Sequence, residues 1–155
     1  ITCLNALDRY LAEPLKKTAP EARYTLEEQI GFKLRLANQK HLEIFNRQMP
    51  DITPTQFAVL AKLRDEVCIS QNHLGRLVGM DAATTKGVVD RLRKKGLVQS
   101  VPSKTDMRRL EISLTDAGVN LTSKAVMTAQ QISAETVSNL TPREVDRLLT
   151  LLEKL

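Results

Sequence analysis

The sequence predicts a mainly helical fold that carries one small β-hairpin, and three observations support this prediction. Helix-initiation signals recur along the chain, most apolar residues fall at helical spacing, and one short segment alternates apolar with polar side chains. Of the 155 residues, 42% are hydrophobic and 26% are charged, so we expect a compact core. No apolar run is long enough to span a bilayer.

The N-terminal region, residues 1–48, is predicted to form an arm followed by one long helix. Leu4, Leu7 and Leu11 lie at helical spacing in the arm. From Thr25 to Gln48 the apolar residues again follow one helical stripe, and Pro50 comes directly after it. We therefore expect the long helix to end at about residue 48.

Two short helices joined by a tight turn are predicted in the middle of the chain. Ser70 can cap a helix over 71–78, and Gly79 can end it in a left-handed conformation. Asp81 can then cap a second helix over 82–95. Two helices separated by about three residues that include glycine form a helix-turn-helix motif.

A β-hairpin follows this motif. Residues 98–101 and 110–114 are predicted as two strands, and residues 102–109 as the tip between them. The alternation in the second strand predicts that three side chains point inward, namely Leu110, Ile112 and Leu114. Residues 52–114 are thus expected to form a winged helix-turn-helix lobe, with the hairpin as its wing.

Two further helices are predicted in the C-terminal region, residues 115–155. Thr115 can cap a long helix that runs to about Ser138. Thr141 begins a capping box with Glu144, and the same pattern occurs earlier at Thr53. The last helix carries an apolar stripe made of Val145, Leu148, Leu149, Leu152 and Leu155.

The positive charge of the chain is concentrated in the central lobe. Between Arg76 and Arg109 there are nine cationic and three acidic side chains, a net charge of +6, whereas the whole chain carries +5. Such a basic patch favours a polyanionic partner over a merely solvated face. The sequence therefore predicts binding to nucleic acid.

The second helix of the motif and the wing are the predicted contact elements. The outer face of the helix begins with small residues, which let a helix backbone enter the major groove of DNA. At the wing tip, Arg108 is expected in the minor groove, with Asp106 holding its guanidinium and Arg109 and Lys104 beside the flanking phosphates. The predicted DNA contacts are Ser70, Gln71, Asn72, Ala82, Ala83, Thr84, Lys86, Arg91, Lys104, Asp106, Arg108 and Arg109.

Other interpretations of the helix, the wing and the cysteines stay open. The helix over 82–95 could be an ordinary amphipathic surface helix, and Asp106 with Arg108 a weak surface ion pair. The lobe could bind proteins as an adaptor, and Cys3 could act as a redox sensor. Cys3 and Cys68 match no metal-binding or redox spacing, and no catalytic constellation is visible, so we predict no enzyme activity, metal or cofactor.

The sequence resembles the MarR family of bacterial transcription regulators. The resemblance rests on residues 52–63, on ISQNHLGRLVGMDAATTKGVVDRLRKKGLV at 69–98, and on DMRRLEISLTDAG at 106–118. It implies a homodimer whose N- and C-terminal helices, from 1–48 and 115–155, interlock and place two winged lobes on a pseudo-palindromic operator. It also implies a repressor that a small, often aromatic, anionic ligand releases from double-stranded DNA. No export signal is visible, so a cytoplasmic location is expected.

The segment IGFKLRLANQKHLEIF, residues 30–45, is similar to the first long helix in the branch of this family that controls aromatic-acid breakdown. The resemblance implies an effector that is an aromatic acid or its coenzyme A thioester. A cation or amide on this helix could hold a carboxylate between apolar walls. The predicted ligand residues are Lys33, Arg35, Asn38, His41, Phe45 and Phe57. The alternative is that His41 is a hydrogen-bonded core histidine and that Lys33 and Arg35 are surface residues.

Overall fold

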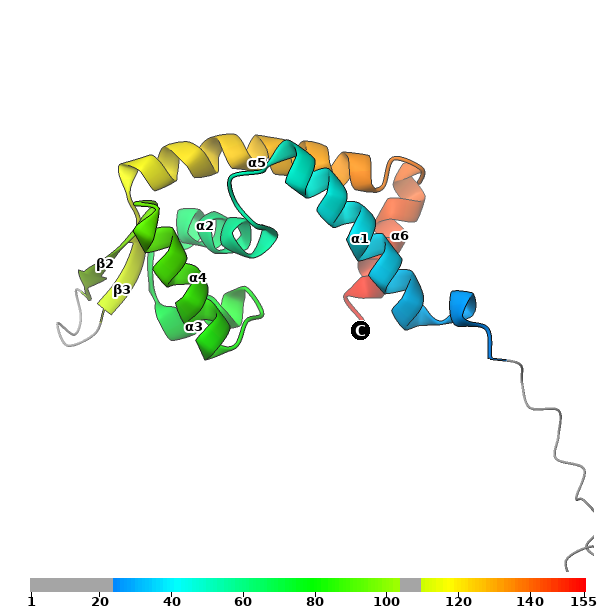
Figure 1. Ribbon diagram of the computed structural model, residues 1–155, viewed down its shortest axis with the longest axis horizontal. Coiled ribbons are helices and arrows are strands. Elements are labelled where there is room, and N and C mark those ends of the chain that lie inside the picture. The colour runs from blue at the N-terminus through cyan, green and yellow to red at the C-terminus, as the bar shows by residue number, and fades with distance from the viewer. Residues whose placement is uncertain (1–23, 104–109) are drawn as a thin grey trace, which may run out of the picture. The chain divides into compact units, whose positions relative to one another are not determined.

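A computed structural model describes residues 24–103 and 110–155 (Figure 1). The predictions made for Cys3 and for the wing-tip residues lie outside this range, the latter being Lys104, Asp106, Arg108 and Arg109. The chain divides into two units, residues 1–35 and residues 36–155, which are described separately.

The first unit contains a short helical turn and the beginning of the long helix. A 3-10 helix spans Leu26–Glu28, and helix α1 spans Ile30–Gln48, so the first turns of α1 belong to this unit. The prediction of one continuous helix from Thr25 was wrong at its start, because Gln29 adopts an extended backbone with ψ 135°. The guanidinium of Arg35 lies 5.1 Å from the centre of the Phe32 ring.

The second unit holds the rest of α1 and all remaining elements. They are α2 (Pro54–Glu66), β1 (Cys68–Ser70), α3 (Gln71–Leu77), α4 (Ala82–Lys94), β2 (Val98–Pro102), β3 (Leu110–Leu114), α5 (Asp116–Thr136) and α6 (Pro142–Leu152). The predicted winged helix-turn-helix, with helices before and after it, is confirmed. In the described ranges every helix is too short or too polar to cross a membrane.

Helix starts follow the predicted capping signals. The hydroxyl of Thr53 accepts a hydrogen bond from the backbone N–H of Gln56, whose side chain accepts in return from the N–H of Thr53. The hydroxyl of Thr115 accepts from the N–H of Gly118 at the start of α5. At α6 the carboxylate of Glu144 accepts from both the N–H and the hydroxyl of Thr141, and these bonds lower its pKa. Each cap satisfies backbone donors that a helix leaves unpaired.

The turn between α3 and α4 is tight. Gly79 has a φ of +64°, the left-handed conformation that was predicted for it, and the N–H of Met80 donates to the carbonyl of Gly75 at 2.9 Å. Gly75 is buried against α4, because a Cβ on it would lie only 2.8 Å from the hydroxyl of Thr85. The two helices of the motif therefore pack closely at this point.

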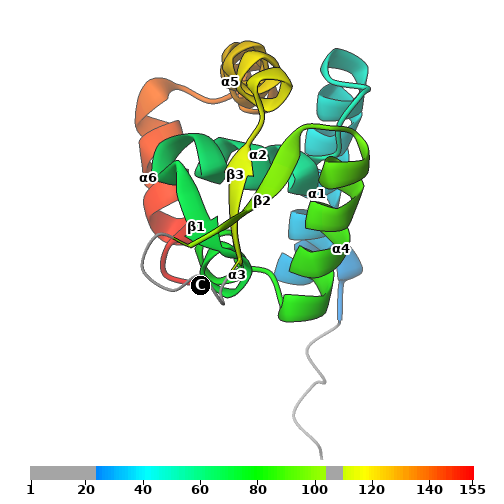
Figure 2. The same cartoon turned by 90° about the vertical axis from the view of Figure 1, so that its left-hand side faces the viewer.

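The sheet has three strands rather than the predicted two. β3 lies in the middle and pairs antiparallel with β2 and with β1, so that Ile112 faces Ser100 on one side and Ile69 on the other (Figure 2). Strand β1 was missed because three residues are too few to show an alternation. The prediction that Leu110 points inward was also wrong. Leu110 is 61% exposed, because β3 begins at the base of the wing, away from the core.

The core lies between the sheet and helices α1 to α5. Its fully buried side chains include Leu60, Leu63, Leu74, Leu92 and Ile132. By contrast, α6 has no buried residue among its eleven, and its predicted apolar stripe is largely exposed in the single chain. Leu148, Leu149 and Leu152 are 38%, 56% and 43% exposed. Such a face is unusual for a helix that functions alone.

Candidate nucleic-acid interface and effector pocket

Helix α4 is the predicted recognition helix, and its first turn is held by Asp81. The carboxylate of Asp81 accepts from the N–H of Thr84 at 2.7 Å and from the hydroxyl of Thr84 at 2.8 Å. These bonds favour the ionised carboxylate and so lower the pKa of Asp81 below its ordinary value. The predicted contact Thr84 is exposed and donates its hydroxyl proton to the cap, so its oxygen remains available only as an acceptor.

The two faces of α4 separate as predicted. Val88, Val89 and Leu92 are buried to 1% exposure or less. The opposite face is exposed and begins with Ala82 and Ala83, whose methyl groups leave the helix backbone accessible. A helix with small side chains at its N-terminal end can enter the major groove of DNA deeply.

The cations of this region fall into two groups. The side chains of Lys86, Arg91 and Lys94 are exposed and make no hydrogen bond or ion pair with any residue in the described ranges. Arg93, in contrast, bonds Asp90 at 3.1 Å and the hydroxyl of Ser100 on β2 at 2.7 Å. The first group is available to phosphates, whereas Arg93 connects α4 to the wing strand.

The start of α3 lies beside the base of the wing. Three predicted contacts, Ser70, Gln71 and Asn72, surround a hollow of about 420 Å³ together with Arg76 and Leu110. The hydroxyl of Ser70 accepts from the N–H of His73 at 3.4 Å and so caps α3. Arg76 was not among the predicted contacts, although its position in the basic patch could have indicated it.

The predicted ligand residues are only partly brought together. In the first unit Lys33 and Arg35 are exposed. In the second unit Asn38 is exposed, and the rings of His41, Phe45 and Phe57 form a chain in which neighbouring ring centres are 6.2 Å apart.

His41 is bonded inside the second unit. Its Nδ1 lies 3.0 Å from the hydroxyl oxygen of Thr136 on α5, and the ring is half-buried. Phe45 is 3% exposed and belongs to the core. This arrangement favours the alternative in which His41 is a hydrogen-bonded structural residue and Phe45 is a packing residue.

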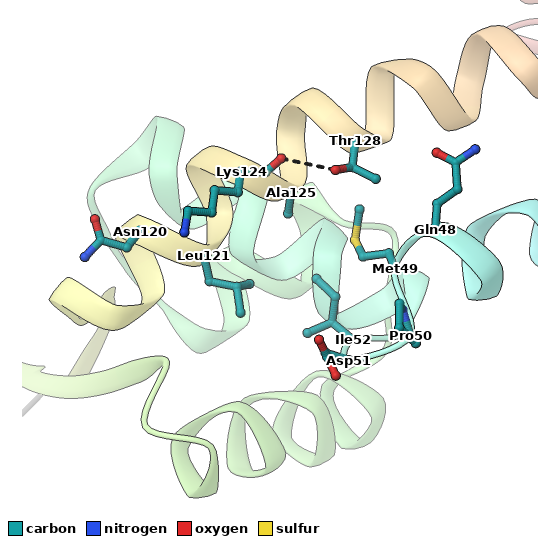
Figure 3. Close-up of a pocket in the computed structure, with 10 residues that line it drawn as sticks. All are labelled: Gln48, Met49, Pro50, Asp51, Ile52, Asn120, Leu121, Lys124, Ala125 and Thr128. Atoms are coloured by element: carbon teal, nitrogen blue, oxygen red, sulfur yellow. Dashed lines mark hydrogen bonds between the residues drawn. The ribbon is translucent and has the colours of Figure 1, made fainter.

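A pocket that the sequence did not indicate lies between the α1–α2 loop and α5 (Figure 3). Its volume is about 370 Å³, within the range of small-molecule sites. Met49, Ile52, Leu121 and Ala125 provide apolar walls, and Lys124 is its one cationic lining residue. Its polar and charged lining residues are Gln48, Asp51, Asn120, Lys124 and Thr128. Only the fold brings these two distant segments together.

Comparison with known proteins places these features in a family. Residues 52–110 match the MarR family. The HTH-type transcriptional repressor NicR of Pseudomonas putida is 36% identical over 148 residues, which cover 90% of this chain and 94% of NicR. The chain belongs to the MarR family. The family assignment and the likeness to aromatic-acid regulators were both predicted from the sequence.

Solved MarR-family structures share the fold. BpsR of Bordetella bronchiseptica, studied for the regulation of its DNA binding by 6-hydroxynicotinic acid, is 34% identical, with a TM-score of 0.80 over 84% of this chain and 95% of BpsR. A mutant MarR of Escherichia coli, complexed with operator DNA, is 32% identical, with a TM-score of 0.74 over 80% of this chain and 91% of that chain. MarR-family proteins are transcriptional regulators, so the chain is a regulator and not an enzyme.

Proposed function

We propose that the chain is a homodimeric repressor of an aromatic-compound catabolic operon, and that an aromatic acid or its coenzyme A thioester releases it from a pseudo-palindromic operator. DNA binding is supported mainly by the outer face of α4. This face starts with exposed small residues and continues with Lys86, Arg91 and Lys94, which have no partner among the described residues. The complex of the E. coli relative with operator DNA supports DNA binding by this chain.

Dimerisation is proposed from the exposed apolar face of α6. Leu148, Leu149 and Leu152 would be removed from water by a second copy of the chain. A two-fold axis would then place the two copies of α4 in successive major grooves, about 34 Å apart.

The proposed effector class fits the pocket between the α1–α2 loop and α5. Met49, Ile52 and Leu121 can cover the faces of one aromatic ring. The ammonium group of Lys124 can pair with a carboxylate, and the side chain of Asn120 can donate a hydrogen bond to it. The action of 6-hydroxynicotinic acid, a single-ring acid, on BpsR supports this class.

The test begins with a duplex selected by the full-length protein from a random pool. Operator binding should weaken steeply with added salt, because each neutralised phosphate releases counterions. A protein adaptor would show no such dependence. Aromatic acids, including 6-hydroxynicotinic acid, and their coenzyme A thioesters are then screened for release of the labelled operator. If the protein selects no duplex, the proposal fails.

The acid that releases the operator also tests the pocket. Lys124→Met should weaken its binding about tenfold, because a charge-assisted hydrogen bond is lost. The matched variant Lys33→Met removes a cation of the ligand set predicted on α1, and it should leave acid binding unchanged. Titration calorimetry without DNA measures both affinities. Loss of binding in Lys33→Met alone would move the site to α1.

The wing provides a separate prediction. Arg108→Ala should weaken operator binding about tenfold, because the minor groove loses its guanidinium. Asp106→Ala should weaken binding less, because it only frees the arginine side chain. Fluorescence anisotropy with the selected duplex measures both effects. Unchanged affinity in both variants would show that the wing does not read the operator.

A further inference from the structure

Lys95 is exposed, and its ammonium group bonds to groups of the same lobe. It is the C-cap residue of α4, and its Nζ donates to the backbone carbonyl of Asp51 at 2.6 Å and to Oε1 of Gln56 at 3.4 Å. Gln56 is 5% exposed and forms the capping box of α2. The last turn of the recognition helix is therefore connected to the α1–α2 loop and to the start of α2.

The two residues after Lys95 are held from a second side. The carbonyl of Gly96 accepts from the hydroxyl of Thr115 at 2.7 Å, and the carbonyl of Leu97 accepts from the N–H of Thr115 at 3.1 Å. The Leu97 carbonyl also lies close to Gly118, where an added Cβ would be 2.0 Å from its oxygen. Segment 95–97 is thus clamped between residues 51–56 and residues 115–118.

Both sides of this clamp continue into the walls of the pocket. Asp51 lines the pocket itself and belongs to the lining segment 48–52. Gly118 is two residues before Asn120, the first lining residue on α5. Each wall of the pocket is therefore connected to segment 95–97 by hydrogen bonds or by adjacent residues of the same element.

We propose that Lys95 is a positioning residue for operator recognition, which fixes the C-terminal end of α4 on the α1–α2 loop and makes the helix respond to the pocket. Lys95 does this without contacting DNA. This inference rests on the proposed function, because it assigns a connection between the effector pocket and the DNA-binding face of α4.

The test compares two adjacent lysines. Both lysines are exposed. Lys95→Met removes one charge and the hydrogen bonds to Asp51 and Gln56, whereas Lys94→Met removes one charge from a side chain that makes no hydrogen bond or ion pair in the described part of the chain. Affinities are measured for the selected operator and for a scrambled duplex of the same length. Lys94→Met should weaken binding to both duplexes alike, because it removes a side chain that is available to phosphates, and it should leave their affinity ratio unchanged. Lys95→Met should leave binding to the scrambled duplex near the wild-type value and lose about fivefold to tenfold in the ratio of operator to scrambled affinity.

Lys95→Arg should restore that ratio to within about twofold, because a guanidinium can donate to the same two oxygens. The acid that releases the wild-type protein should lower the operator affinity of Lys95→Met by a smaller factor. The affinity of this variant for the acid itself should be unchanged. Equal ratios in Lys95→Met and Lys94→Met would overturn the proposal.

A measurement on the free protein separates this inference from the proposed function. Amide hydrogen exchange over residues 92–97 should speed up in Lys95→Met and stay at the wild-type rate in Lys94→Met. Equal exchange in the two variants would overturn the positioning role even if the protein bound no DNA. Conversely, Lys95→Met could exchange faster than Lys94→Met over residues 92–97 while the protein selects no duplex. That result would support the positioning role of Lys95 and reject the proposed function.

Discussion

Gly118→Ala is expected to lower the free energy of unfolding by about 3 kcal/mol, the upper end of the usual range for overpacking a buried site. The added Cβ would lie 2.0 Å from the carbonyl oxygen of Leu97, a backbone atom that no change of rotamer can move. That oxygen also accepts from the N–H of Thr115, and Leu97 itself is 7% exposed. Making room therefore displaces a buried residue and weakens the start of α5.

Urea unfolding at one fixed protein concentration measures this effect, because the stability of a dimer depends on concentration. Gly87→Ala is the matched control in α4. Its Cβ would meet only the flexible end of Arg91 at 3.5 Å, so the better helix propensity of alanine should stabilise the fold by about 0.5–1 kcal/mol. An unfolding midpoint of Gly118→Ala at or above the wild-type value would show that residues 97 and 118 do not pack as described.

Local signals in the sequence predicted much of the fold. Capping residues such as Ser70, Asp81 and Thr115 act on backbone donors within three positions, so their effect can be read without knowing the fold. The left-handed turn at Gly79 is similarly local. The three-residue strand Cys68–Ser70 was not predicted, because it forms only through backbone pairing with a distant strand.

The candidate site also has a part that local sequence signals predicted and a part that they could not predict. The exposed face of α4 was predictable because helical periodicity separates it from the buried Val88, Val89 and Leu92. The pocket was not predictable, since it joins the α1–α2 loop to α5 across about 70 residues of sequence. The ligand role of His41 was implied by the family resemblance, whereas its place on the apolar stripe favoured a hydrogen-bonded structural histidine, and its bond to Thr136 fits that alternative.

Gly75→Ala is the second substitution with a large expected effect, and it acts on the angle between α3 and α4. The new Cβ would lie 2.8 Å from the hydroxyl of Thr85 and 3.1 Å from the carbonyl of Met80. Thr85 is fully buried, and its hydroxyl donates to the carbonyl of Asp81 at 2.8 Å. We expect the two helices to separate, with a loss of about 2 kcal/mol in stability and a weakening of operator binding by more than about tenfold.

A double-mutant cycle identifies the cause. Thr85→Ala removes the hydroxyl that the new Cβ meets, so Gly75→Ala combined with Thr85→Ala should be less impaired than the sum of the two single variants, by about 1 kcal/mol. Thr85→Ser keeps the hydroxyl and should give no such relief. Urea unfolding and operator affinity are measured for every variant. If the serine and alanine variants relieve Gly75→Ala equally, the close approach of Gly75 to Thr85 does not set the position of the recognition helix, and its orientation must depend on the clamp at its other end.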